Sequence, residues 1–296
     1  MDFTQSQKDS AKFLAKIAPI YQKHFLRDEI YKEQFGDGYK ALVCFLKNYA
    51  YERQGAAAAY SEIARRCISQ RYGNGHNWRV PTQNDAQALW DDYKNIAKSD
   101  YNLRDNKTGK ARVNEARNPM NMNGGIVAKL ASEGIPNIAI YVRYSINVGK
   151  SAEAYNFFVK EVRGVGEKIA SFYLRDIAYL ARLDEAKISS DVYLLQPMDT
   201  WLEQTFRILF ESGVPTNVSK KLQERQKLIV ELCKKSEVSS IAFNQGAWVL
   251  GSQIAGEFGK LEEALTNRNR ARKIIQDYIN GKQGYLDVVR DVLNSL

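Results

Sequence analysis

The chain has 296 residues, 44% of them hydrophobic, so it is long enough to bury a core and is not a disordered tail. Its 43 lysines and arginines outnumber 34 acidic residues, and the net charge of +9 favours a polyanionic partner. No apolar run approaches the roughly 20 residues that a membrane helix needs. We therefore expect no membrane partner. Three widely separated cysteines exclude a disulfide framework and a four-cysteine metal site, so we expect a cytoplasmic protein with reduced thiols.

Apolar residues recur at helical spacing along most of the chain, and only six prolines interrupt it, which predicts an all-α fold. The exception is the region 70–125, which is rich in Gly, Asn and Arg. We expect a basic loop region there, with a short β-hairpin at "NKTGKARV". Basic side chains with an aromatic among them suit contact with a nucleic-acid backbone, although such a loop is also typical of a solvated surface. The candidates for this contact are Arg71, Trp78, Arg79 and Arg112.

Two glycines, Gly164 and Gly166, interrupt the helical pattern in "VRGVGEKIAS". A helix is predicted before them, and an apolar stripe including Ala170 and Tyr173 predicts another after them, so 155–182 has the pattern of a helix-hairpin-helix. Glycines allow close backbone approach, and amides at a helix start attract phosphate, which makes Gly164, Gly166 and the neighbouring Arg163 candidate phosphate-binding residues. The alternative is a plain tight turn followed by a solvated lysine.

A second motif, "QPMDTWLEQ", places Asp199 between Pro197 and a predicted helix. The carboxylate is therefore a natural N-cap, which is also its simplest interpretation. The only histidines, His24 and His76, are too isolated to indicate a metal site, so we expect none.

Together, "VRGVGEKIAS" and "PMDTWLEQ" resemble the signature of the helix-hairpin-helix–Gly/Pro–Asp (HhH-GPD) superfamily of DNA glycosylases, which reads G-h-G-x-K followed by P-x-D and a helix. The 8-oxoguanine glycosylase and endonuclease III branches are the most similar. The resemblance covers 157–209, with an echo at "FNQGAWVLGSQI", and the N-terminal third matches no motif. It implies one glycosylase unit over 1–296, with two helical lobes and an active-site cleft between them, acting as a monomer on double-stranded DNA and associated with the nucleoid if the source is bacterial.

By this resemblance, Lys168 matches the lysine that attacks C1′ of the deoxynucleotide and forms a Schiff base with the sugar, which would also allow strand cleavage. Asp199 matches the carboxylate that stabilises the cationic sugar. If Lys168 only binds phosphate, Asp199 would activate water instead, giving a monofunctional enzyme. No cofactor is required, and the resemblance allows a monovalent cation at the carbonyls of the turn.

The spacing departs from the family, because 31 positions separate the two residues (199 − 168), more than is usual. Either "ARLDEAKISSDVYLL" contains an insertion, or Asp191 is the true carboxylate. Candidates for contact with the flipped base are Phe172, Trp201 and Trp248, each of which is otherwise a core residue. Trp201 stands where the 8-oxoguanine branch often has a histidine. Two substrates therefore stay open: an oxidised purine such as 8-oxoguanine, or a hypermodified phage base such as glucosylated cytosine in antiviral defence. The alternative to an enzyme is a non-catalytic helix-hairpin-helix DNA-binding module.

Overall fold

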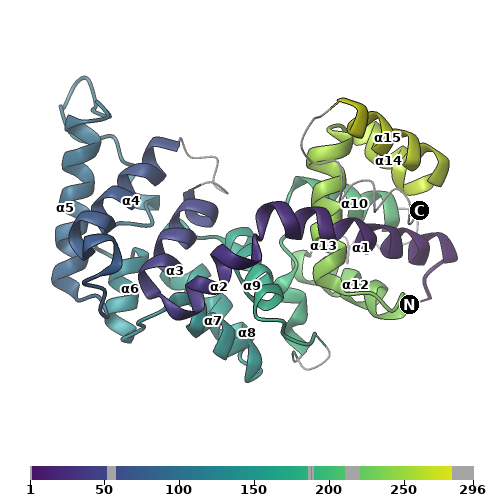
Figure 1. Ribbon diagram of the computed structural model, residues 1–296, viewed down its shortest axis with the longest axis horizontal. Helices are drawn as coiled ribbons and strands as arrows, with labels where there is room; N and C mark the ends of the chain where they lie inside the picture. The colour runs from purple at the N-terminus through teal and green to yellow at the C-terminus, as the bar shows by residue number, and fades with distance from the viewer. Residues whose placement is uncertain (1, 52–57, 186–187, 189, 211–220, 282–296) are drawn as a thin grey trace. The chain divides into compact units, whose positions relative to one another are not determined.

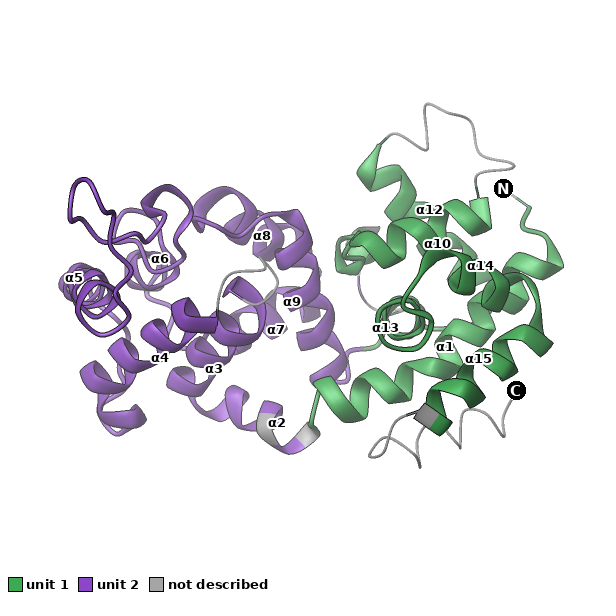
Figure 2. Cartoon of the chain, turned by 90° about the horizontal axis from the view of Figure 1, so that it is seen from above, with its two compact units in different colours: residues 1–28, 184–186, 190–296 green, residues 29–183, 187–189 purple. Residues whose placement is uncertain are grey.

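Helices form every regular element of the part of the chain that the computed structural model describes, residues 2–51, 58–185, 188, 190–210 and 221–281. Figure 1 shows the helices joined by turns and loops, and the predicted all-α class is confirmed. Within these residues no helix is long and apolar enough to cross a membrane. Contacts divide the chain into two compact units, drawn in different colours in Figure 2.

Unit 1 comprises residues 1–28, 184–186 and 190–296 and so contains both ends of the chain. Its elements are α1 (Gln5–Phe25), the 3-10 helix η6 (Ser190–Leu195), α10 (Thr200–Phe210), α12 (Leu222–Lys235), α13 (Ser240–Val249), the π-helix η7 (Leu250–Ala255), α14 (Phe258–Thr266) and α15 (Arg268–Gly281). Its centre is the contact between α1 and α13, where a Cβ added at Gly246 would lie 1.8 Å from the carbonyl oxygen of Leu14. Glycine at this position therefore lets the two backbones touch.

Unit 2 comprises residues 29–183 and 187–189. Its elements are α2 (Asp28–Gly36), whose first residue belongs to unit 1, α3 (Gly38–Phe45), the π-helix η1 (Leu46–Tyr51), α4 (Ala58–Tyr72), the 3-10 helices η3 (Gly73–Gly75) and η4 (Glu115–Arg117), α5 (Gln83–Ser99), α6 (Ile126–Glu133), α7 (Ile138–Asn147), α8 (Ser151–Asn156), the π-helix η5 (Phe157–Glu161) and α9 (Glu167–Leu180).

Helix α9 is the central helix of unit 2, since every residue from Ile169 to Ala178 is buried. The ring of Tyr173 packs at 4.9 to 5.5 Å from three aromatic rings of η1, α3 and η5. The sequence predicts one buried apolar face for this helix, but the buried surface is wider, because Arg175 and Asp176 are buried as well. They tolerate burial by pairing: Nε of Arg175 donates to Oδ1 of Asp176 at 2.8 Å, and the Tyr49 hydroxyl donates to Oδ2 at 3.1 Å.

The region 70–125 is not a continuous loop, because the 17-residue helix α5 lies within it. Thr82 caps this helix in a capping box with Asp85, and Leu89, Trp90 and Tyr93 are buried at helical spacing. The expected β-hairpin is reduced to one isolated antiparallel bridge between Arg104 and Ala111, and the described residues form no strand. The turn between them uses Gly109 at a φ of 63°.

Candidate functional site

The turn between η5 and α9 has the geometry expected of a hairpin between two helices. The last turn of the first helix is π-helical, and the chain then reverses through Val162, whose carbonyl accepts from the Val165 amide at 3.2 Å. Gly164 has a φ of 74°, in the left-handed region where glycine is favoured. Gly166 instead has an extended backbone, with φ −93° and ψ 178°, and a Cβ added there would meet nothing within 4 Å. Only the first glycine is therefore needed for the turn itself.

The exposed N-terminus of α9 contrasts with its buried body. Gly166, Glu167 and Lys168 are exposed, and no described side chain caps the helix. Side chains cap some helices, since Thr4 caps α1, Thr82 caps α5 and Ser239 caps α13, whereas α6, α12 and α14 lack a side-chain cap as α9 does. The first amides of a helix lack intrahelical partners and carry positive partial charge, so the start of α9 suits an anion.

A groove of about 860 Å³ lies along this turn. Residues 159–169 line it together with Asn114 and Arg117, and we call it the turn groove. Its basic side chains are Arg117, Lys160, Arg163 and Lys168. Of its two acids, Glu161 pairs with Lys129 outside the groove at 3.3 Å, so the groove as a whole is positively charged.

Asp199 caps α10, which confirms the N-cap prediction. Its Oδ1 accepts from the amides of Trp201 at 3.0 Å and Leu202 at 2.8 Å. Asp191, the alternative carboxylate, lies in η6 and not before an α-helix. Lys168 belongs to unit 2 and Asp199 to unit 1.

The longer spacing between Lys168 and Asp199 includes Glu185, whose contact with α13 could not be predicted from the sequence. Its Oε2 accepts from the amide and hydroxyl of Ser240 at 2.9 and 2.6 Å. A carboxylate here stabilises the start of α13. Nothing in the local sequence signals this contact, because the two residues are 55 positions apart.

The three candidate base-contacting rings lie in three different environments. Phe172 is only 2% exposed, does not line the turn groove, and lies under the guanidinium of Arg175 at 4.8 Å. Trp201 is partly exposed and lies against Gly251, where an added Cβ would be 2.5 Å from the indole. Trp248 is also partly exposed, and its ring meets Tyr21 and Phe25 edge-on at 5.5 and 4.9 Å. Phe172 is thus a core residue of unit 2, whereas the two tryptophans are partly exposed.

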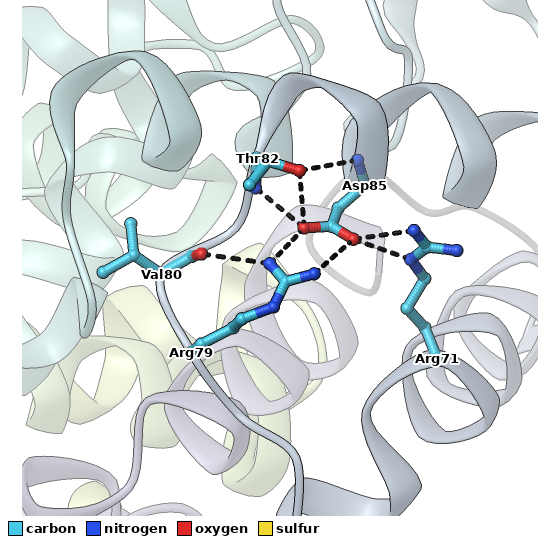
Figure 3. A network of polar contacts seen from close by, with 5 residues as sticks. All are labelled: Arg71, Arg79, Val80, Thr82 and Asp85. Atoms are coloured by element: carbon cyan, nitrogen blue, oxygen red, sulfur yellow. Dashed lines mark hydrogen bonds and ion pairs between the residues drawn. The ribbon is translucent and has the colours of Figure 1, made fainter.

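The candidate DNA contacts Arg71 and Arg79 both bind one buried carboxylate, Asp85, as Figure 3 shows. Arg71 Nε donates to Oδ1 at 2.8 Å, and Arg79 donates to both oxygens, at 2.5 and 3.1 Å. Burial alone would raise the pKa of Asp85, but hydrogen bonds from Arg79, Thr82 and Arg71 outweigh it and hold the pKa below its usual value. The Arg79 side chain is nevertheless 55% exposed, so contact with DNA remains a prediction for it.

The remaining candidates for DNA contact are Trp78, which is partly exposed, and Arg112. The Trp78 indole donates to the carbonyl of Pro136 at 3.0 Å and packs edge-on against Tyr72 at 4.9 Å. It therefore anchors the loop before α5. Arg112 is exposed, and its carbonyl accepts from the Tyr60 hydroxyl at 3.1 Å. Within the described residues no group of three or more His, Cys, Asp or Glu side chains could hold a metal ion.

Comparisons with protein-family models, curated proteins and solved structures gave no match to this chain. The site is therefore interpreted from its own geometry.

Proposed function

We propose that this protein is a DNA glycosylase that flips a damaged or modified base out of duplex DNA and cleaves its N-glycosidic bond. The observation that carries the proposal is the start of α9, where an otherwise buried helix presents an uncapped, exposed first turn with Lys168 to a basic groove. Phosphate binding by such a turn places a nucleotide beside the lysine. The motif resemblance at 164–168 and 197–199 supports the same assignment.

In the proposed reaction Lys168 and Asp199 are the catalytic residues. The amine of Lys168 forms a bond to C1′ while the bond from C1′ to the base breaks, and the base leaves with the electron pair and takes up the proton that the amine loses. Opening of the sugar ring then gives a Schiff base on Lys168, from which β-elimination cleaves the strand. Asp199 supplies a negative charge where the sugar becomes cationic, which lowers the barrier.

The substrate is an oxidised purine such as 8-oxoguanine, or a hypermodified base such as glucosylated cytosine in phage DNA. An indole at Trp201, where a histidine is often found in the 8-oxoguanine branch, would favour stacking on the base over a charged hydrogen bond. A panel of duplexes carrying each of these bases distinguishes the two.

The second candidate is a non-catalytic DNA-binding module. The observation that favours it is the N-cap geometry of Asp199, because a carboxylate that accepts from two helix amides has a structural role without any chemistry. In this case Lys168 binds phosphate only.

Borohydride trapping separates these candidates. The wild-type protein, incubated with lesion-bearing duplex and borohydride, is expected to form a covalent adduct that Lys168→Gln abolishes. Lys160→Gln is the charge-matched comparison, since it removes the same charge from the same groove but not the attacking amine, and at saturating protein it should still form the adduct. Base release that survives Lys168→Gln but not Asp199→Asn would instead indicate the monofunctional route.

A further inference from the structure

The turn groove has a second wall, which comes from a segment far from the hairpin in sequence. Asn114, the N-cap of η4, and Arg117, its last residue, line the groove. Neither residue belongs to the hairpin motif. The chain that follows this wall is bound to the turn, because the Arg163 amide donates to the carbonyl of Gly124 at 2.8 Å.

Buried asparagines fix the conformation of this wall. Asn118 is 4% exposed, donates to the carbonyl of Val113 at 2.8 Å, and accepts from the Tyr51 hydroxyl at 2.7 Å. Asn121 is 5% exposed and donates to the carbonyl of Glu115 at 3.0 Å. Arg117 is therefore carried by a preorganised backbone, which reduces the entropy lost when it binds a partner.

The cations of the groove are available to a ligand. Arg117, Lys160, Arg163 and Lys168 form no ion pair with another described residue, unlike Arg71 and Arg79, which share Asp85. A volume of about 860 Å³ falls within the range of roughly 300–1,000 Å³ for pockets that bind whole organic ligands, and exceeds what one phosphate fills. A strand of DNA supplies anionic groups in a row, which one isolated anion does not.

We propose that Arg117 binds a second backbone phosphate, next to the one at the start of α9, so that the turn groove follows one strand of the DNA over two consecutive phosphates. This inference rests on the proposed function for the identity of the partner as DNA, but it requires no base excision. It assigns a nucleic-acid contact to the region before α6, at an arginine that pairs with no acid among the described residues.

Salt dependence of binding to undamaged duplex tests the contact without catalysis. Each phosphate contact contributes about 0.9 to the slope of log K against log salt concentration. Arg117→Gln is expected to lower the magnitude of that slope by about 0.9 and to weaken binding several-fold at low salt. Lys98→Gln, which removes the same charge from an exposed position of α5 outside the groove, should leave the slope unchanged.

A duplex with an uncleavable abasic analogue then fixes the register of the complex. Single phosphates of the analogue-bearing strand are replaced by uncharged methylphosphonates, and the dissociation constant is measured for each. The wild-type protein should lose affinity at two neighbouring positions, and Arg117→Gln should become insensitive at one of them. An unchanged slope, or a variant that stays sensitive at both positions, would overturn the inference. If the slope and the scan change as expected but no duplex releases a base, the glycosylase proposal fails and the groove assignment stands.

Discussion

The two glycines of the hairpin have different reasons to be glycine. Gly164 has positive φ, whereas Gly166 has an extended backbone with open space where a side chain would project. The fold thus requires glycine at the first position only. At the second, the absence of a side chain leaves room for a ligand to approach the amides of α9.

Gly164→Ala is expected to destabilise the protein by about 1–2 kcal/mol, because an L-residue is strained in the left-handed region. Gly166→Ala should change the free energy of unfolding by less than about 1 kcal/mol, since its φ and ψ suit alanine. The same Gly166→Ala change should weaken DNA binding several-fold. Chemical denaturation and fluorescence anisotropy measure the two effects, and a Gly166→Ala protein with wild-type affinity would contradict the phosphate assignment.

The buried carboxylate of Asp85 should make the stability of the fold depend on pH in the acidic range. Its pKa is lowered in the folded state, so its contribution is complete above the unfolded pKa of about 3.9 and declines as the pH falls below that value. Asp85→Asn should lower the free energy of unfolding by about 2 kcal/mol at pH 7, because charge-assisted hydrogen bonds to two arginines are lost.

The difference between wild type and Asp85→Asn should shrink when unfolding is measured at successively lower pH, from 5 towards 2. Asp92→Asn is the control, because that carboxylate is exposed on the same helix. Its loss should change the free energy of unfolding by less than about 0.5 kcal/mol. A difference that stays constant with pH would mean that the Asp85 carboxylate does not carry the effect.

At the scale of the elements, the contact between α1 and α13 depends on a single glycine. Gly246→Ala would place a Cβ 1.8 Å from the Leu14 carbonyl oxygen, so the helices must separate at a cost of at least about 2 kcal/mol. Gly259→Ala in α14 is the matched control, because a Cβ there meets nothing within 4 Å and alanine favours a helix. Urea unfolding should show the first variant destabilised and the second unchanged or slightly stabilised; equal effects would contradict the close contact.

The sequence predicts the helices that carry an apolar period or a recognisable cap. Asp199 is identified as an N-cap from its neighbours alone, and the two helices around the hairpin follow from their spacing and glycines. Helix α5 could have been predicted in the same way, since Thr82 and Asp85 form a capping box before buried Leu89 and Trp90. The abundance of Gly and Asn on either side obscured that signal.

Contacts between distant residues could not be predicted. The pairing of Arg71 and Arg79 with Asp85 depends on how α4 packs against the loop before α5, so both arginines looked available from sequence. The same holds for Arg117, which sequence reasoning did not distinguish from other basic residues of its region, yet which lines the turn groove. A periodic pattern gives the face of a helix but not its partner.

At the scale of the whole molecule, the two residues proposed to be catalytic belong to different units. Lys168 comes from unit 2, built of one nearly continuous stretch, and Asp199 from unit 1, which includes both ends of the chain. Substituting either residue is therefore expected to remove activity while leaving the fold of the other unit intact. Circular dichroism and thermal unfolding of Lys168→Gln and Asp199→Asn check that the losses are chemical.

The most direct test of the glycosylase proposal is release of free base, measured by mass spectrometry, from duplexes that carry 8-oxoguanine or glucosylated cytosine. The wild-type protein should release one of these bases and leave an abasic site or a cleaved strand, and Asp199→Asn should release none above background. If the folded wild-type protein binds these duplexes but releases no base from any of them, the protein is a DNA-binding module and not a glycosylase.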